Sequence, residues 1–291
     1  MDYLWLVIAT VITLIAPFAV AVLAGVDRRI TARMQNRVGP PIMQPIYDLM
    51  KLLAKTKMLV NKGQIILATL YVTMSILALW MFVAGADLLI IFFVLSAAAA
   101  FYTLAAYSVL SPFSQLGATR ELIQVLAYEP VVLMVFFGVF LVNGSFSSAA
   151  TDNMLILWLP LTFAAMILVL LVKLQKSPYD VAEAHTEIVG GPEIEYSGKF
   201  LALVKVGHWY EAALMFAVIS LFFGHPNLYI AFAGKLILVF LALFIVILVD
   251  NSTARLRFGQ MARVVLTYGL ALTAVNALVV WAVQEGVIPW P

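Results

Sequence analysis

The chain contains no cysteine among its 291 residues. Without thiolates it cannot hold a cysteine-ligated iron–sulfur cluster, a thiolate zinc site or a disulfide. Histidine is scarce too, and no i, i+4 pairing indicates a haem or metal site among the three present, His185, His208 and His225. We therefore expect no metal or cofactor in this chain, and any redox chemistry in which it takes part would be carried by other chains.

Charged residues are also few, at 11% of the sequence against 64% hydrophobic residues. About a quarter of the residues of a soluble domain are charged. A membrane-spanning helix needs roughly 20 apolar residues, and eight segments qualify, at about 3–24, 64–84, 88–110, 119–142, 153–173, 199–223, 228–250 and 261–283. The sequence thus predicts an all-α integral membrane protein with about eight transmembrane helices.

Lysine and arginine are absent from alternate loops. The segments at 85–87, 143–152 and 224–227 contain none, whereas 25–63 is rich in both. Because short cytoplasmic loops carry the Lys/Arg excess, we predict that 25–63 and 174–198 are cytoplasmic and that both termini lie outside the inner membrane. The first span lacks the basic flank and cleavage site of a signal peptide, so we expect it to be retained. The net charge of +2 gives no indication of nucleic acid.

We find no internal repeat and no linker, which predicts a single polytopic membrane domain over residues 1–291. One segment, 41–58, has the pattern of a short amphipathic helix. Its apolar residues recur at helical spacing, with three charged residues on the other side: Ile42, Ile46, Leu49, Met50 and Leu53 against Asp48, Lys51 and Lys55. This composition suits the membrane surface. An ordinary helix between two spans is the alternative.

The segment from Lys176 to Lys199 holds a third of the 15 acidic residues, namely Asp180, Glu183, Glu187, Glu193 and Glu195. Carboxylates crowded between two spans cannot all ionise cheaply, so their proton affinities should be coupled. Such a segment suits proton or ion handling. The alternative is a solvated docking surface that pairs with basic residues of a partner.

Ionisable residues also fall inside predicted spans. Glu129 lies near the middle of the fourth span and is followed by Pro130, while Glu121 lies near the cytoplasmic end of the same span. A charged carboxylate at mid-bilayer costs about 2.5–3.5 kcal/mol even on the lenient insertion scale. We therefore expect Glu129 to face the bundle interior or a hydrated cavity, where the proline can kink the helix and admit water.

The sixth and seventh spans carry further ionisable groups, Lys205, His208, Glu211, Lys235 and Asp250. The first three are spaced at i, i+3 and i+6, which allows one broad polar flank on the helix. Ionisable groups inside a membrane often mark ion paths. Structural ion pairs are the alternative for all of them, and His208 suits either a buried imidazole or a member of a proton relay.

Three blocks of sequence match one family pattern. Asp27-Arg-Arg-Ile-Thr-Ala-Arg-Met-Gln-Asn-Arg-Val-Gly-Pro40 is similar to E-R-K-x-x-A-x-x-Q-x-R-x-G-P, and Leu116-Gly-Ala-Thr-Arg-Glu-Leu-Ile-Gln-Val-Leu-Ala-Tyr-Glu129 is similar to L-G-x-x-R-x-x-A-Q-x-x-S-Y-E. The acidic segment is similar to R-x-P-F-D-L-x-E-A-E-x-E-L-V-x-G-Y-x-x-E-Y-S-G. Together the blocks resemble the complex I membrane subunit at the foot of the peripheral arm (NADH dehydrogenase subunit 1 type) and its relatives in energy-converting hydrogenases.

Departures from the complex I pattern favour one branch of this family. His185 stands where the pattern has a glutamate, Gly191-Pro192 replaces G-Y, and Asn251-Ser-Thr occupies the region of a Trp-x-Arg motif. Residues expected to shape a quinone chamber are thus altered, while the coupling carboxylates are kept. The resemblance therefore favours the group 4 [NiFe]-hydrogenase type, which needs no quinone site.

The resemblance implies a non-catalytic subunit that anchors partner subunits and couples their chemistry to H⁺ or Na⁺ translocation. The expected partners are hydrogenase large (Ni–Fe) and small ([4Fe–4S]) subunits, ferredoxin through them, antiporter-like membrane subunits and the lipid bilayer. The implied ion route runs from Glu183 and Glu187 to Glu129 and Glu211, with His208, Glu121 and the other loop acids as further candidates. Docking of partners is assigned to the basic residues of the first two blocks, Arg29, Arg33, Arg37 and Arg120.

Three other functions stay open from the sequence. Complex I itself, with this chain as its quinone-site subunit, is the alternative within the family. A secondary transporter would show inverted repeats and spans broken at matching positions, and we find no such symmetry. A purely structural anchor would have no need of Glu129.

Overall fold

The computed structural model describes residues 3–56, 58, 61–149, 153–182 and 184–286. These residues form helices joined by short connections, and the only strand-like pairing among them is an isolated bridge between Asp87 and Ser147. The helices are α1 (Tyr3–Met34), α2 (Gln44–Ala54), α3 (Lys62–Ala84), α4 (Leu88–Tyr107), α5 (Pro112–Asn143), α6 (Leu155–Trp158), α7 (Pro160–Lys173), α8 (His185–Ile188), the 3₁₀ turn η1 (Gly191–Glu193), α9 (Lys199–Ser220), α10 (Leu228–Ser252) and α11 (Phe258–Gln284).

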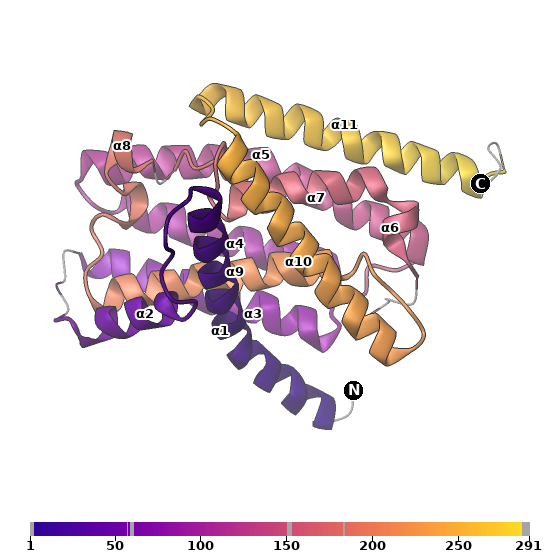
Figure 1. Cartoon of the computed structure of the whole chain (residues 1–291), viewed down its shortest axis with the longest axis horizontal. Coiled ribbons are helices and arrows are strands. Elements are labelled where there is room, and N and C mark those ends of the chain that lie inside the picture. Colours follow the sequence, from indigo (N-terminus) through magenta and orange to yellow (C-terminus); the bar gives the residue numbers. More distant parts are fainter. Residues whose placement is uncertain (1–2, 57, 59–60, 150–152, 183, 287–291) are drawn as a thin grey trace.

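Seven of these helices are long and apolar enough to cross a membrane: α1, α3, α4, α5, α9, α10 and α11. The predicted all-α membrane fold is therefore confirmed. Helices α3, α4, α5 and α9 run alongside one another, α10 crosses them obliquely, and α11 lies along the edge of the bundle (Figure 1). The predicted amphipathic segment at 41–58 contains α2, which packs against α1 and α9 at one end of the bundle.

The span predicted at 153–173 is broken. Its chain forms the single turn α6 and then the 14-residue α7, with Leu159 between them at φ −125° and ψ 48°. Pro160 causes the break, because proline disfavours a helical conformation in the residue before it and has no N–H to donate. At 1.5 Å per residue, α7 is about 21 Å long, less than the roughly 30 Å of a bilayer's hydrocarbon core.

The polar backbone groups at this break are paired by one side chain of α11. Asn276 accepts hydrogen bonds from the Leu161 and Thr162 N–H groups at 2.8 and 3.2 Å, and its Nδ2 donates to the Trp158 carbonyl at 2.8 Å. Unpaired backbone groups at membrane depth cost several kcal/mol each. Asn276, which is 2% exposed, is therefore what lets the broken span lie inside the bundle.

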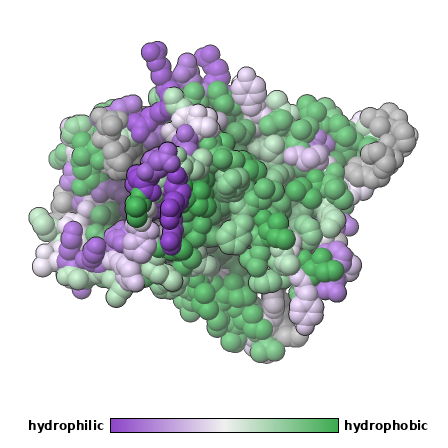
Figure 2. Space-filling model, viewed as in Figure 1, coloured by the Kyte–Doolittle hydropathy of each residue, from purple (hydrophilic) through white to green (hydrophobic). Residues whose placement is uncertain are grey.

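The two longest connections lie at the same end of the bundle. A Cβ placed on Gly198 would lie 2.6 Å from the Thr56 carbonyl oxygen, so the end of the first connection touches the start of α9. At the opposite end the Leu88 N–H donates to the Phe146 carbonyl and the Ile156 N–H to the Phe222 carbonyl. Hydrophilic side chains gather on the end that carries α2 and α8, in the left part of Figure 2. The assignment of that end to the cytoplasm stays a prediction.

Single cysteines in this cysteine-free chain provide a test of orientation. Ser148 is 5% exposed, so we choose the exposed Ala149 at one end and the exposed Ala54 at the other. A membrane-impermeant thiol reagent applied to intact cells should label Ala149→Cys but not Ala54→Cys, because positive charge is retained on the cytoplasmic side. In inverted vesicles the pattern should reverse. Labelling of both from one side would contradict the topology.

Candidate functional site

The centre of the site is an ion pair inside the bundle. Lys173, the last residue of α7, places its Nζ 2.8 Å from Glu211 Oε2 of α9, and the two side chains are only 6% and 5% exposed. The same ammonium lies 5.4 Å from the centre of the Tyr128 ring of α5. Either charge alone would be costly at this depth, so each is tolerated because of the other. Lys173 thus connects three helices through two contacts, with Glu211 of α9 and with Tyr128 of α5.

His208 lies between this pair and the acidic segment. Its Nε2 is 3.4 Å from Glu193 Oε1, and its Nδ1 is 3.9 Å from Glu211 Oε2 and 3.0 Å from the Tyr71 hydroxyl. The Tyr102 ring meets the imidazole edge-on with 5.0 Å between centroids. A titratable ring thus separates one carboxylate of the connection from one inside the bundle. An imidazole can accept a proton on one nitrogen and release it from the other.

Glu193 is the acid of the connection that reaches this cluster. Its Oε2 lies 2.6 Å from Lys205 Nζ, and its side chain is 12% exposed. Burial by itself would raise the pKa of Glu193, but the nearby His208 imidazole and the charge of Lys205 outweigh it and hold the pKa well below its usual range. Glu193 is therefore ionised near neutral pH. The structure brings together three residues predicted from the sequence, Glu193, His208 and Glu211.

Two other described acids of the connection, Asp180 and Glu187, have cations of their own. Asp180 accepts two hydrogen bonds from Arg255, and Glu187 lies 2.6 Å from Arg120. The expectation that the carboxylates crowd together is therefore wrong for these residues, because basic side chains from different parts of the chain separate them. No ion pair of Glu195 is found among the described residues. Glu183, a predicted relay member, lies outside the residues that the structure describes.

Arg120 holds the acidic segment from inside. Its side chain is 21% exposed, and besides the Glu187 carboxylate it binds the Val181 carbonyl at 3.1 Å. These contacts lie within the chain, and a docking role for Arg120 stays a prediction. Three arginines near the end of α1 do remain exposed, Arg29, Arg33 and Arg37. A docking role for these three stays a prediction.

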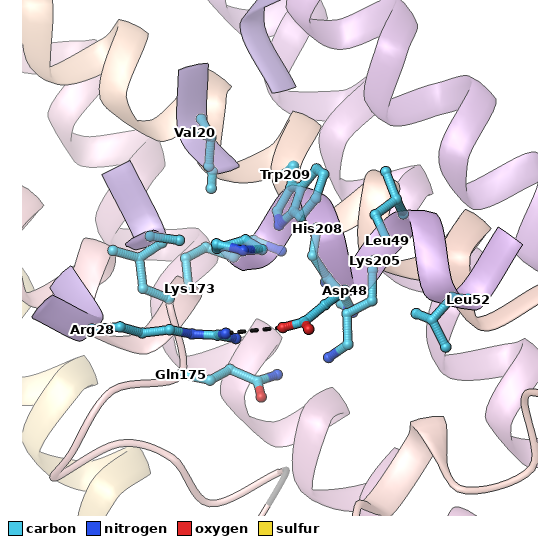
Figure 3. A pocket seen from close by; sticks show the side chains of 14 residues that line it. Val20, Arg28, Asp48, Leu49, Leu52, Lys173, Gln175, Lys205, His208 and Trp209 are labelled. Carbon is cyan, nitrogen blue, oxygen red and sulfur yellow. Dashed lines mark hydrogen bonds and ion pairs between the residues drawn. The ribbon is translucent and has the colours of Figure 1, made fainter. Parts of the chain in front are cut away.

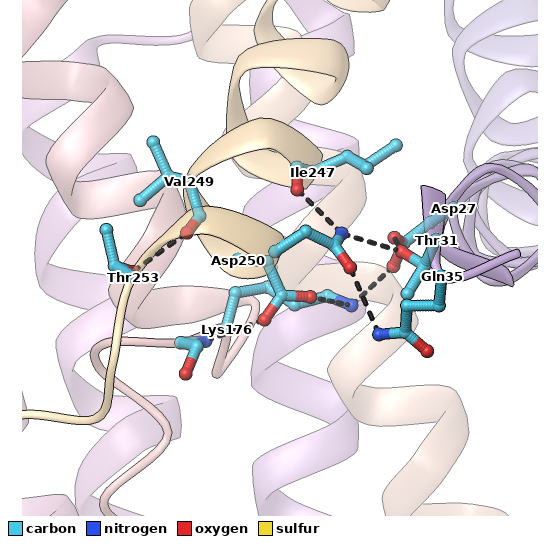
Figure 4. Close-up of polar contacts among 10 residues, drawn as sticks. Asp27, Thr31, Gln35, Lys176, Ile247, Val249, Asp250 and Thr253 are labelled. Atoms are coloured by element: carbon cyan, nitrogen blue, oxygen red, sulfur yellow. Dashed lines mark hydrogen bonds and ion pairs between the residues drawn. The ribbon is translucent and has the colours of Figure 1, made fainter. Parts of the chain in front are cut away.

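A second ion cluster fixes the start of the acidic segment (Figure 4). Lys176 Nζ lies between Asp27 of α1 and Asp250 of α10, at 2.5 and 3.3 Å, and the Ser177 N–H donates to Asp250. Burial would lower the pKa of Lys176, but the two carboxylates outweigh it and raise the pKa. Asn251 strengthens the contact by donating to Thr31. Asp250 therefore has the structural role that was its alternative in the sequence.

The two acids of α5 lie in different surroundings. Glu121 is 7% exposed and accepts a hydrogen bond from Gln175, next to the central cluster. Glu129 instead lines an open cavity of about 470 Å³ between α4, α5 and α11, whose other walls are apolar: Phe92, Leu126, Pro130, Leu133, Met134 and Leu270. Of the two positions expected for Glu129, the bundle interior and a hydrated cavity, the structure shows a cavity, and Glu129 lines it as a half-buried residue. That the cavity is hydrated stays a prediction.

A further cavity of about 370 Å³ opens beneath α2, between α1, the end of α7 and α9. Its walls mix apolar residues such as Leu49 and Trp209 with Lys173, Lys205 and His208 of the central cluster. An ion pair between Arg28 and Asp48, at 3.2 Å, crosses it in the view of Figure 3. The cavity therefore connects the membrane-surface helix to the buried charges.

The sequence missed Lys173, Tyr71, Tyr102 and Tyr128 as members of the site. Lys173 stands at the end of an apolar run, where a lysine ordinarily marks topology. The tyrosines stand within apolar spans, where aromatic residues are common core residues. The one signal available in the sequence was equal depth in the membrane. Tyr71 lies nine residues after the start of α3 and His208 nine residues after the start of α9, and both helices start at the same end of the bundle.

Gly117 controls the position of the acidic segment. A Cβ at this residue would lie 2.6 Å from Gly191 Cα and 2.6 Å from Pro192 Cδ, two residues before Glu193 in η1. Gly117→Ala should therefore push η1 away from α5 and destabilise the protein by about 1–3 kcal/mol. Thermal unfolding in detergent measures this. Gly259→Ala, where a Cβ meets nothing within 4 Å, is the matched control, and equal stability of the two variants would contradict the packing.

Comparison with known proteins gives consistent matches over nearly the whole chain. A family described as NADH dehydrogenase matches residues 7–281. Hydrogenase-4 component C of Escherichia coli is 30% identical over 80% of this chain and 83% of its own, and formate hydrogenlyase subunit 4 of the same organism is 27% identical over 90% and 95%. A subunit of the NADH-quinone oxidoreductase of Rubrobacter xylanophilus is 32% identical over 74% and 73%.

One solved structure has the same fold. A chain of the membrane-bound sulfane sulfur reductase, an archaeal respiratory membrane complex, superimposes with a TM-score of 0.85 at 26% identity, covering 94% of this chain and 98% of that one. The solved structure is that of a respiratory membrane complex, and the three relatives are named as a component or subunit of a hydrogenase, a formate hydrogenlyase and an NADH-quinone oxidoreductase.

Proposed function

The chain belongs to the NADH dehydrogenase family, and from this premise we propose that it couples the redox chemistry of partner subunits to ion movement across the membrane. It is a membrane subunit of the complex I-like and energy-converting hydrogenase type. The proposal adds that its own carboxylates and histidine carry the coupling, while partner subunits hold the [4Fe–4S] clusters and the Ni–Fe centre.

One observation carries the proposal, the arrangement of Glu193, His208 and Glu211. Glu193 belongs to the connection beside the expected partner-binding end, and Glu211 lies about 18 Å along α9 from its start at Lys199, at 1.5 Å per residue. His208 stands between them at 3.4 and 3.9 Å. A change in charge above the connection would alter how strongly Glu193 attracts a proton on His208. The imidazole could then pass that proton inward to Glu211.

The hydrogenase type of complex is favoured over complex I by two features. The relatives include hydrogenase-4 component C and formate hydrogenlyase subunit 4, and His185 and Gly191-Pro192 depart from the complex I pattern. The second candidate, a quinone-site subunit of complex I, is favoured by the cavity of about 370 Å³ beneath α2. Two measurements on the purified complex test this candidate: extraction with organic solvent to quantify bound quinone, and identification of its subunits. Stoichiometric quinone together with NADH-oxidising flavin subunits would decide for complex I.

Glu193→Gln tests the coupling role. The variant keeps the shape of the side chain but removes the charge that faces His208 and Lys205. In sealed vesicles we expect ion translocation to fall about tenfold or more, whereas hydrogen evolution from a soluble electron donor changes little. Glu285→Gln, at an exposed residue beyond the end of α11, is the control. Full translocation by Glu193→Gln would remove the proposed role.

A further inference from the structure

The outer side of α2 is apolar although it faces away from the bundle. Met43, Tyr47, Met50 and Leu53 are 47%, 49%, 61% and 49% exposed. Their spacing of four, three and three residues places them on one side of the helix. The side toward the bundle is apolar as well, since Leu49 and Leu52 line the cavity beneath α2. We call the four exposed residues the α2 edge.

Positive charge lies beside the α2 edge. Lys51 is exposed on the same helix, Lys55 is exposed directly after its end, and Lys199 is exposed at the start of α9. A surface cleft of about 360 Å³ separates the two helices and is lined by Leu53, Ala54, Lys55, Thr56 and Lys199. No ion pair of Lys55 or Lys199 is found among the described residues.

The two lysines of this cleft are held in place by backbone packing. Gly198, with φ at +53°, lies directly against the Thr56 carbonyl oxygen, where a Cβ would come within 2.6 Å. Each residue is the chain neighbour of one lysine. The lysines therefore stand at a fixed joint between α2 and α9. Asp48 does not neutralise them, because Arg28 lies 3.2 Å from one of its oxygens and Lys51 lies 3.8 Å from the other.

We propose that the α2 edge and its cleft bind anionic phospholipid headgroups of the adjoining membrane leaflet. The apolar row would enter the acyl region, as in other interfacial helices, and the phosphate would lie between Lys55 and Lys199. A zwitterionic lipid brings no net negative charge to the two ammonium groups, and an acidic protein surface leaves the apolar row uncovered. An anionic lipid both balances the charge of the two lysines and covers the apolar row with its acyl chains. Each lysine near an anionic surface contributes about fivefold in affinity, so the pair contributes roughly 25-fold.

A lipid-proximity measurement on the purified complex tests this proposal. Ala54→Cys carries an environment-sensitive fluorophore, and the complex is reconstituted into nanodiscs containing equal fractions of either brominated phosphatidylglycerol or brominated phosphatidylcholine. Complex without the introduced cysteine gives the background from partner subunits. We expect the phosphatidylglycerol to quench more strongly, and we expect Lys55→Gln with Lys199→Gln to abolish the difference. Lys235→Gln, in α10, should leave the difference unchanged.

Each other outcome overturns the proposal. Equal quenching by the two lipids would show that the surface accepts any lipid, and absence of quenching would show that a protein partner covers it. A preference that survives loss of both lysines would place its origin elsewhere. Because the readout is the distance to lipid and not ion movement, the result is independent of the coupling function.

Discussion

Lys173→Met is expected to lower the free energy of unfolding by about 3–5 kcal/mol, because it leaves Glu211 as an uncompensated charge inside the bundle. Both side chains are almost fully buried, and their 2.8 Å contact joins α7 to α9. Unfolding in detergent, followed by tryptophan fluorescence, measures the loss.

The double variant separates the ion pair from the packing of its side chains. Lys173→Met combined with Glu211→Gln removes both charges, so most of the stability should return. A double-mutant cycle should then give an interaction energy near the upper end of the usual range, about 3 kcal/mol. Lys51→Met is the matched control, because its partner Asp48 is exposed and the pair spans 3.8 Å. If Lys173→Met and this control lower the free energy of unfolding by the same amount, within about 0.5 kcal/mol, the buried ion pair does not hold the helices together.

The sequence predicts most of the fold because apolar length is a local property. Runs of apolar residues identify the spanning helices, and helical spacing identifies α2. The broken span at 153–173 could not be predicted in the same way, because the run stays apolar across Leu159 and Pro160. What makes the break tolerable is Asn276, which lies 114–118 residues away from the groups that it pairs.

The candidate site could be predicted only in part, for a related reason. Glu193, His208 and Glu211 are conspicuous in the sequence because charge is rare there. Their partners are not conspicuous, because they lie far away in the sequence. Lys173 is 38 residues from Glu211, and Tyr71 is 137 residues from His208. The separation of the loop acids by Arg120 and Arg255 is likewise a tertiary effect. A count of carboxylates per segment indicates crowding, and only the folded chain shows which cation lies beside each.

The position of Glu129 suggests where an ion route would leave the subunit. Glu121 and Glu129 belong to the same helix and are separated by eight residues, which corresponds to about 12 Å of rise and a rotation of about 80°. Glu121 lies beside the central cluster, whereas Glu129 lines the apolar cavity between α4, α5 and α11. Pro130 has no N–H to donate to the Leu126 carbonyl, so α5 lacks one backbone hydrogen bond beside Glu129. A carboxylate here suits transfer to a neighbouring membrane subunit.

Glu129→Gln should therefore cut ion translocation in sealed vesicles about tenfold or more while hydrogen evolution from soluble electron donors stays largely intact. The amide keeps the size of the side chain but cannot release a proton, so the route would end at Glu121. Leu126→Gln is the matched control, because it places an amide in the same cavity and retains the carboxylate. Equal loss of both activities would indicate misassembly. Retention of both would show that Glu129 is structural, and the lateral route would have to be withdrawn.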